Sequence, residues 1–205
     1  KYFESAAKAL NYGASMAKGD YLLFTHHDVI FGENELKNIS EYLNKINDFG
    51  IIGVAGKNED GGVIGNIYNG IPKVLISSQK IYKHTRVQTI DEVLFIIKND
   101  LFKKIMLNEK NNTWHLYAVD YCLNMKKLKY GVYVIPSDIY HKSAGASMNK
   151  YYYKELKKLC NRYKNEKIIY TTMGNWHTNS FLLFFDIIKV KILLLLINIK
   201  RKIKR

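Results

Sequence analysis

Histidine and aspartate side chains follow an apolar stretch near the start of the chain. In "YLLFTHHDVIF", residues 21–31, His26, His27 and Asp28 come directly after residues that suit a buried strand. Two imidazoles and a carboxylate can bind a divalent cation, and imidazole in the set favours Mn²⁺ over Mg²⁺. The alternative is a polar rim at a strand end, where such residues only face water.

Further ionisable residues follow or interrupt other apolar stretches. Asp91 and Glu92 follow "VQTI", and His141 comes shortly after "VYVIP". Asp120 lies inside the otherwise apolar "LYAVDYCL". Ligands of open α/β sheets bind beyond the carboxyl ends of the strands, so we expect these side chains to gather there. For Asp120, a helix carboxylate that bonds to a neighbour is an equally good interpretation.

The elements that must position these residues are predicted from apolar spacing. Helical spacing is present in residues 3–20, 33–48, 114–131 and 151–167. Short apolar strands are predicted at residues 21–24, 51–56 and 132–136, and residues 87–105 read as two strands, separated by the acidic pair, and a helix. The Gly- and Asn-rich residues 56–73 predict a long loop or irregular hairpin. Alternating helices and strands indicate an α/β domain with a mainly parallel sheet.

The composition indicates one globular domain followed by a basic tail. The 205 residues include 47% hydrophobic residues and only two prolines, and the formal net charge is +14. Residues 181–205 carry seven Lys or Arg and one Asp, which is +6 of that charge. The two cysteines, Cys122 and Cys160, match no zinc or redox spacing, so free thiols in a reducing compartment such as the cytosol are expected.

The tail is both apolar and basic. Its stretch "FLLFFDIIKVKILLLLINI" holds 15 strongly apolar residues among 19, but also Asp186, Lys189 and Lys191. Insertion of the apolar residues contributes about −5 to −9 kcal/mol, whereas three central charges cost about 8–10 kcal/mol. We therefore expect an amphipathic helix at the membrane surface rather than a spanning one. A terminal helix packed on the core or on a second subunit is the alternative.

The order of motifs resembles family 2 glycosyltransferases. "ALNYGASMAKGDYLLFTHHDV" resembles their Asn-x-Gly turn, Ala-Lys-Gly-Asp step, apolar strand and DXD motif. "IIGVAG", "TIDEVLFIIKNDLF", "LYAVDYCLNMKKLKYGVYVIP" and "YHKSAGAS" follow in the family's order. The resemblance covers about residues 5–150 and is closest to the glycosyltransferase-like branch related to a streptomycin-biosynthesis protein.

The resemblance implies a GT-A fold, which is a Rossmann-like α/β/α sandwich. It implies a nucleotide-diphospho-sugar donor with Mn²⁺ or Mg²⁺ at its diphosphate. His26, His27 and Asp28 stand at the DXD positions, with Asp28 as the carboxylate that reaches the metal and His26 near it. His141 matches a histidine that completes the metal site. Asn11 and Gly13 match the turn that shapes the donor pocket.

The sequence departs from the family pattern at the catalytic base. Family members carry Glu-Asp-x-Asp before the segment that here reads "YCL", but Tyr117 and Ala118 hold the Glu-Asp positions and only Asp120 remains. An inverting transfer needs one carboxylate to accept the proton of the acceptor hydroxyl. The candidates are Asp120, Asp91 and Glu92, and for the last two a contact with the acceptor is as plausible as the role of base.

These observations predict a domain over residues 1–180 and a membrane-surface tail over residues 181–205. The domain is expected to lack the first strand and helix of the family. The predicted activity is that of a hexosyltransferase-like enzyme acting on a glycan or lipid-linked acceptor, in the cytoplasm and peripheral to the inner face of the membrane. The alternatives are a non-catalytic scaffold of the same fold, and a basic protein that binds nucleic acid or membranes. Nucleic acid is the weaker choice, because no basic stripe interleaves with aromatic residues in a known pattern.

Overall fold

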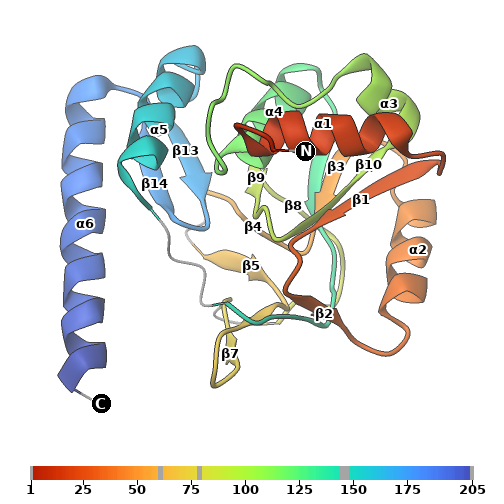
Figure 1. Ribbon diagram of the computed structural model, residues 1–205, viewed down its shortest axis with the longest axis horizontal. Coiled ribbons are helices and arrows are strands. Elements are labelled where there is room, and N and C mark those ends of the chain that lie inside the picture. The colour runs from red at the N-terminus through yellow and green to blue at the C-terminus, as the bar shows by residue number, and fades with distance from the viewer. Residues whose placement is uncertain (1, 60–61, 78–79, 144–147, 204–205) are drawn as a thin grey trace.

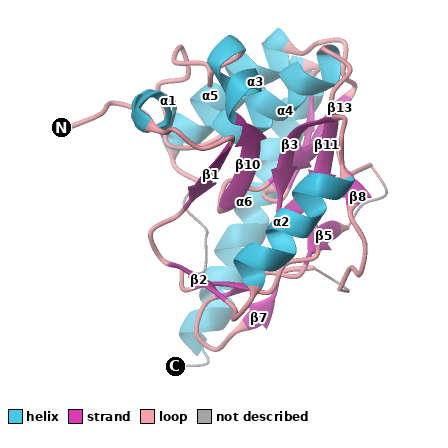
Figure 2. Ribbon diagram, turned by 90° about the vertical axis from the view of Figure 1, so that its right-hand side faces the viewer, coloured by secondary structure: helices cyan, strands magenta, loops and turns pink. Residues whose placement is uncertain are grey.

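The computed structural model describes residues 2–59, 62–77, 80–143 and 148–203, and shows a sheet with helices on both faces (Figure 1, Figure 2). The helices are α1 (Ala6–Met16), α2 (Glu35–Lys45), α3 (Asn99–Lys104), α4 (Tyr117–Lys127), α5 (Lys150–Arg162) and α6 (Ser180–Ile203). The central five-stranded sheet has the order β1-β10-β3-β11-β8 and is built from β1 (Tyr21–Thr25), β3 (Phe49–Gly53), β8 (Thr85–Arg86), β10 (Leu94–Lys98) and β11 (Gly131–Val134).

Three smaller sheets flank the central one. They are composed of β2 (Val29–Phe31), β12 (Ile139–His141), β6 (Tyr68–Asn69) and β7 (Val74–Leu75); of β5 (Val63–Gly65), β4 (Ala55–Lys57) and β9 (Thr89–Ile90); and of β13 (Ile168–Thr171) and β14 (Gly174–His177). The predicted loop at residues 56–73 therefore contains short strands where it is described.

The prediction of a mainly parallel sheet is wrong. In the central sheet as described, β1 pairs with β10, β10 with β3, and β11 with β8 in antiparallel fashion, and β11 with β3 is the one parallel pair. β10 is reached from β3 through residues 54–93, which form short strands rather than a crossover helix where they are described. A chain that returns without a helical crossover can enter the sheet in the opposite direction, and β10 does so between β1 and β3.

Two hydrophobic clusters sandwich the central sheet. One face packs against α1, α3 and α4, through residues such as Ala7, Phe102 and Cys122. The other face packs against α2, through Ile39. In β1 the side chains alternate. Leu22 and Phe24 are buried in the first cluster, while Tyr21, Leu23 and Thr25 are exposed. The α/β/α layering that the sequence indicated is confirmed.

A third cluster joins α4 to the C-terminal part of the chain. It contains Leu156 of α5, Trp176 of β14 and Leu183 of α6, all buried. Helix α6 starts where Asn179 Oδ1 accepts hydrogen bonds from the N–H groups of Phe181 and Leu182, as a helix cap does. The tail is thus a helix that packs beside α5 and β14 at the flank of the molecule (Figure 1).

The surface of α6 that faces away from the cluster is also apolar. Its exposed side chains include Phe181, Phe184, Phe185, Ile192 and Leu193. An amphipathic pattern is therefore not confirmed for this helix. Among the described residues, no helix combines the length and the hydropathy needed to cross a bilayer.

Candidate functional site

Two histidines and one aspartate meet where β1 ends and β12 ends. Antiparallel pairing of β2 with β12 sets His141 opposite Val29, one residue after Asp28. His141 Nε2 lies 3.2 Å from Asp28 Oδ1 and 3.4 Å from His26 Nδ1. The three ligand atoms lie within 4.8 Å of one another, a spacing that one divalent cation can bridge. Ser143 supports the cluster, since its N–H donates to Asp28 Oδ2 and its Oγ lies 2.9 Å from His141 Nε2.

The protonation states of this cluster suit a metal. Burial and the neighbouring His141 lower the pKa of His26, although Asp91 and Asp28 act in the opposite direction. Partial burial pushes the pKa of Asp28 upward, but His141 and the hydrogen bonds from Ser143 outweigh it, so the pKa lies below its usual value. At neutral pH the pair is a neutral imidazole and a carboxylate, and these are the forms that coordinate cations.

The other residues predicted to bind the donor lie apart from this cluster. His27 is exposed and is not a member of the cluster. Asn11 is buried in α1, where its Nδ2 donates to Leu107 O and its Oδ1 accepts from Leu107 N. These bonds tie α1 to the segment after α3. Gly13 faces open space on the same helix.

Asp91 lies at the end of β9 with both carboxylate oxygens held. Oδ1 accepts a 3.0 Å hydrogen bond from the Val93 N–H, and Oδ2 accepts a 2.5 Å bond from Thr172 Oγ1. Thr172 belongs to the turn between β13 and β14, about eighty residues further along the chain. Each oxygen keeps lone pairs for a further partner, so the carboxylate is oriented but not saturated.

Glu92, the next residue, is in a different environment. Its side chain is 16% exposed and points to the start of α4. Burial and the charge of Asp91 raise the pKa of Glu92 well above its usual value, although the N–H groups of residues 116–118 oppose the rise. His115 Nδ1 lies 4.0 Å from Glu92 Oε2. Two carboxyl groups in different surroundings therefore lie side by side, and one of them, Glu92, has a raised pKa, an arrangement that suits acid–base chemistry.

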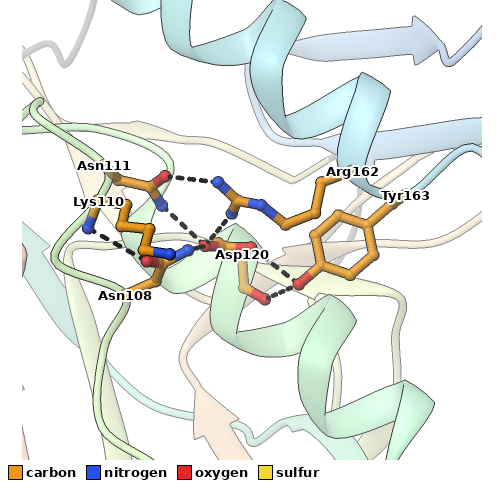
Figure 3. Close-up of polar contacts among 6 residues, drawn as sticks. All are labelled: Asn108, Lys110, Asn111, Asp120, Arg162 and Tyr163. Atoms are coloured by element: carbon orange, nitrogen blue, oxygen red, sulfur yellow. Dashed lines mark hydrogen bonds and ion pairs between the residues drawn. The ribbon is translucent and has the colours of Figure 1, made fainter.

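Asp120 is enclosed in a hydrogen-bond network (Figure 3). Its Oδ2 accepts from Asn108 Nδ2, Asn111 Nδ2 and Arg162 Nη1 at 2.9, 2.8 and 2.5 Å. Its Oδ1 accepts from Tyr163 OH at 2.8 Å. The residue is 3% exposed. This network joins α4 to the end of α5 and to the loop before α4, which corresponds to the alternative interpretation of a helix carboxylate bonded to neighbours.

A cavity of about 180 Å³ brings residues of the His26–Asp28–His141 cluster and the acidic pair together. Its wall includes His26 and His141 at one part and Asp91 and Glu92 at another. Asn11, Gly13 and Asp120 are not among its lining residues. Of the predicted site residues, the cavity is therefore lined by His26 after β1, by Asp91 and Glu92 after β9, and by His141 at the end of β12.

The cavity also has walls that the sequence did not predict. They come from β6, the loop before α4, α5 and the β13–β14 turn, and include Asn69, His115, Tyr152 and Thr172. Tyr152 stands in a Tyr-rich helix, and Thr172 in a stretch with no motif. In the sequence, only the polar or aromatic character of these side chains could have indicated a role in a site. Many residues on the surface share that character, so it did not identify them.

Comparison with known proteins gives a family and a fold. The profile described as "Glycosyltransferase like family" matches residues 2–163. No curated protein has a significant sequence match. Among solved structures, "Crystal structure of GalNAc-T7 with UDP, GalNAc and Mn2+" is similar with a TM-score of 0.57 and 13% identity, and the match covers 79% of this chain and 36% of that one.

A second solved structure, "Crystal Structure of A197 from STIV", has a TM-score of 0.38 and 14% identity over 70% of this chain and 77% of that one, which is too distant to support an argument. The first similarity shows a fold like that of GT-A enzymes, while this chain spans about a third of that protein's length. The branch related to a streptomycin-biosynthesis protein stays a prediction.

Proposed function

The chain belongs to the glycosyltransferase-like family, and on that premise we propose that it transfers a sugar from a nucleotide-diphospho-sugar to a hydroxyl group of a glycan or lipid-linked acceptor. The observation that carries the proposal is the shared cavity. A cluster able to hold a divalent cation and a pair of adjacent carboxyl groups, one of them with a raised pKa, open on the same space. A hydrolase could use similar groups, but the family and the fold favour transfer.

His26, Asp28 and His141 are the proposed ligands of Mn²⁺ or Mg²⁺, with Mn²⁺ favoured by the two imidazoles. When bound, such an ion supplies positive charge that stabilises a departing nucleotide diphosphate. The similar solved structure, which contains UDP, GalNAc and Mn²⁺, supports this combination of ligands. Ser143 orients His141 and Asp28 through the two contacts described above.

Asp91 is the proposed base. It takes the proton of the acceptor hydroxyl while the acceptor oxygen forms a bond to the anomeric carbon of the donor. The bond from that carbon to the diphosphate oxygen breaks, its electron pair leaves with the nucleotide diphosphate, and the configuration is inverted. Thr172 and the Val93 N–H hold the Asp91 carboxylate in position. Asp120 is a poorer candidate because four side chains already occupy it.

Helix α6 is the proposed contact with a membrane. Its exposed apolar side chains, including Phe185 and Ile192, lie on the same helix as Lys189 and Lys191. Apolar groups with nearby ammonium groups bind the interface of anionic bilayers. This surface would place the enzyme at the inner face of the membrane, where lipid-linked acceptors are found.

The first experiment measures nucleotide-diphosphate release and thermal stability with a panel of UDP- and GDP-sugars, with and without Mn²⁺. We expect a rise in melting temperature with Mn²⁺ and one nucleotide, because both bind the folded state, and turnover with one donor. Stabilisation without turnover for any donor and acceptor would favour the non-catalytic scaffold, for which the replaced Glu-Asp positions, Tyr117 and Ala118, are the supporting observation. No response to any nucleotide would contradict the proposal.

The membrane contact is tested by sedimentation with vesicles that contain about 30% phosphatidylserine. Phe185→Glu and Ile192→Glu should reduce the bound fraction severalfold, because each places a carboxylate on the apolar surface of α6. Leu36→Glu is the matched control, since Leu36 is 63% exposed on α2. Equal binding by all variants would leave α6 as a packed terminal helix.

A further inference from the structure

A second pocket, of about 720 Å³, lies between α5 and the first turns of α6 and shares no lining residue with the cavity described above. Lys157 and Lys164 line this α5–α6 pocket from α5 and the turn after it, and Phe184 lines it from α6. Asn161 and Ser180 add neutral polar groups, and none of its described lining residues is acidic. The pocket therefore combines positive charge from one element with an aromatic ring from the other.

The positive charge of the α5–α6 pocket is not neutralised by the protein where it is described. Both lysines of the pocket are exposed. The two acidic residues nearest to them in the sequence are engaged with other lysines, since Glu155 Oε1 lies 2.7 Å from Lys158 Nζ and Glu166 Oε2 lies 2.7 Å from Lys126 Nζ. An anionic group from outside the protein can therefore bind both free ammonium groups without breaking an internal ion pair.

An exposed aromatic surface adjoins the α5–α6 pocket. Phe184 belongs to both, because it lines the pocket and is 57% exposed. Its ring packs against that of Phe185, which in turn packs against Phe181, with centroid separations of 5.5 and 5.1 Å. Phe181 and Phe185 are exposed as well, and α6 lies beside α5 at the flank of the molecule (Figure 1). Three packed aromatic rings thus lie next to two ammonium groups.

This combination favours a ligand in which a phosphate group is joined to hydrocarbon. A free phosphate would contact the lysines but leave the phenylalanine rings in water. A phospholipid of a bilayer supplies both parts, with phosphate at the level of the lysines and acyl chains for the rings. The volume of the pocket lies within the range of about 300–1,000 Å³ that is typical of small-molecule sites, which is sufficient for one headgroup.

We infer that the α5–α6 pocket binds the headgroup of an anionic phospholipid, with Lys157 and Lys164 at its phosphate and Phe184 against the start of its acyl chains. The inference rests on the proposed membrane contact of α6 and deepens it, because it names the lipid class and adds α5 to the contact. A choline headgroup is a weaker ligand, since its own ammonium group is repelled by the two lysines. The pocket should therefore make the protein prefer anionic to zwitterionic bilayers.

The test is sedimentation with vesicles of phosphatidylcholine alone and with vesicles that also contain about 30% phosphatidylserine. The wild type should bind the anionic vesicles more tightly. The double variant Lys157→Glu/Lys164→Glu should weaken that binding about tenfold or more, because two charges that attract the headgroup are reversed. The matched control is Lys37→Glu/Lys104→Glu, which changes the net charge equally at exposed residues of α2 and α3 and should bind nearly as the wild type does.

A second variant separates loss of binding from loss of folding. Lys157→Gln/Lys164→Gln removes the two charges without adding carboxylates, and should weaken binding to anionic vesicles in the same direction by a smaller factor. Both lysines are exposed, so the melting temperature of either double variant should remain that of the wild type. Binding to vesicles of phosphatidylcholine alone should change little in either variant.

The inference is overturned if the wild type does not prefer anionic vesicles, or if the variants at the pocket bind like the wild type. It is also overturned if Lys37→Glu/Lys104→Glu loses as much binding, because overall charge would then be sufficient. A dimer in light scattering that Phe184→Glu converts to a monomer would show that a second copy covers α6, and would contradict a lipid at this place.

The outcome is independent of the transferase. Nucleotide-diphosphate release with a water-soluble acceptor does not involve the α5–α6 pocket, so the pocket variants should release diphosphate at the rate of the wild type. Absence of that release in every variant and in the wild type would contradict the transferase and leave the vesicle result as it stands. Binding that is reduced by Phe185→Glu but unchanged by the lysine variants would retain the membrane contact of α6 and reject the headgroup site.

Discussion

Asp120, which is buried, and the half-buried Asp91–Glu92 pair are carboxyl groups in contrasting surroundings. Asp120 accepts hydrogen bonds from four side chains, one of them the Arg162 guanidinium (Figure 3). Asp91 accepts only two, and Glu92 Oε1 has no partner among the described residues. The first carboxylate is saturated and joins two helices, whereas the pair keeps bonding capacity and faces a cavity.

From this contrast we expect unused bonding capacity to identify the base better than position in a motif does. Asp120 is the last carboxylate left in its motif, which made it a candidate from the sequence. A base must accept a proton from a substrate, and a saturated carboxylate can do so only after losing a partner. Substitutions should therefore separate the two regions, with stability lost at the network and activity lost at the cavity.

The largest expected effect is on stability. Asp120→Ala removes the acceptor for Asn108, Asn111, Arg162 and Tyr163 and should lower the free energy of unfolding by about 3 kcal/mol or more. The melting temperature should fall by about 6–12 °C in calorimetry. Asp100→Ala, at a residue whose side chain is 89% exposed, should change it by less than about 2 °C. Unchanged stability with lost activity would restore Asp120 as the base.

The next effect is on activity. Asp28→Ala removes a carboxylate ligand and should reduce turnover by about 10²-fold or more, because the departing diphosphate loses its stabilising charge. The melting temperature without Mn²⁺ should remain close to that of the wild type, because Asp28 is partly exposed. His27→Ala, one residue away and outside the cluster, is the control for turnover. Full turnover in the Asp28 variant would disprove the metal assignment.

Tyr163→Phe removes one donor from the network, a hydroxyl that contacts both the carboxylate and the backbone carbonyl of Asp120. The Tyr163 hydroxyl donates to Asp120 Oδ1 at 2.8 Å, and its loss should reduce the free energy of unfolding by about 1.5 kcal/mol. Urea denaturation measures the change, and Tyr82→Phe serves as the control because Tyr82 is 87% exposed. Because several donors share the Asp120 carboxylate, Tyr163→Phe should reduce the free energy of unfolding much less than Asp120→Ala does. Equal reductions would contradict a shared network.

The smallest effect, taken per pH unit, concerns the titration of Glu92. Glu92 has a raised pKa in the folded protein, so above about pH 4.5 the unfolded chain releases a proton that the folded chain keeps. The wild type therefore loses about 1.4 kcal/mol per pH unit between the unfolded and folded pKa values. Glu92→Gln cannot titrate, and its melting temperature relative to the wild type should rise by several degrees between about pH 4.5 and pH 7. A constant difference would show that Glu92 is ionised.

The helices were predictable because their apolar spacing also determines their packing. Ala6 and Ala7 of α1 and Ile39 of α2 are buried on the faces that the pattern indicated. The direction of β10 was not predictable, since it depends on how residues 54–93 fold between β3 and β10. The β13–β14 hairpin was missed because "IIYTTMGNWH" lacks both strict alternation and a strong turn pair.

Part of the site was predictable because ligands of α/β sheets bind beyond the ends of strands, and polar residues at those positions can be read from the sequence. His26, Asp28 and His141 were grouped by position and family resemblance, and the structure brings them together. Thr172 and Tyr152 come from elements whose placement depends on packing against α4, over a long separation in sequence. Local patterns do not report such contacts. Asn11, a residue of the family-like motif, is bonded to Leu107 and is not among the residues that line the cavity.

The β13–β14 hairpin begins after the last residue of the family match, residue 163. It is nevertheless bonded to the strand that precedes the acidic pair, through Thr89 Oγ1 to Tyr170 O and Tyr170 N to Gln88 Oε1. The wall of the cavity therefore includes residues such as Thr172 that lie outside the region that the family profile matches. Family similarity alone accounts for only part of the surface that a substrate would meet.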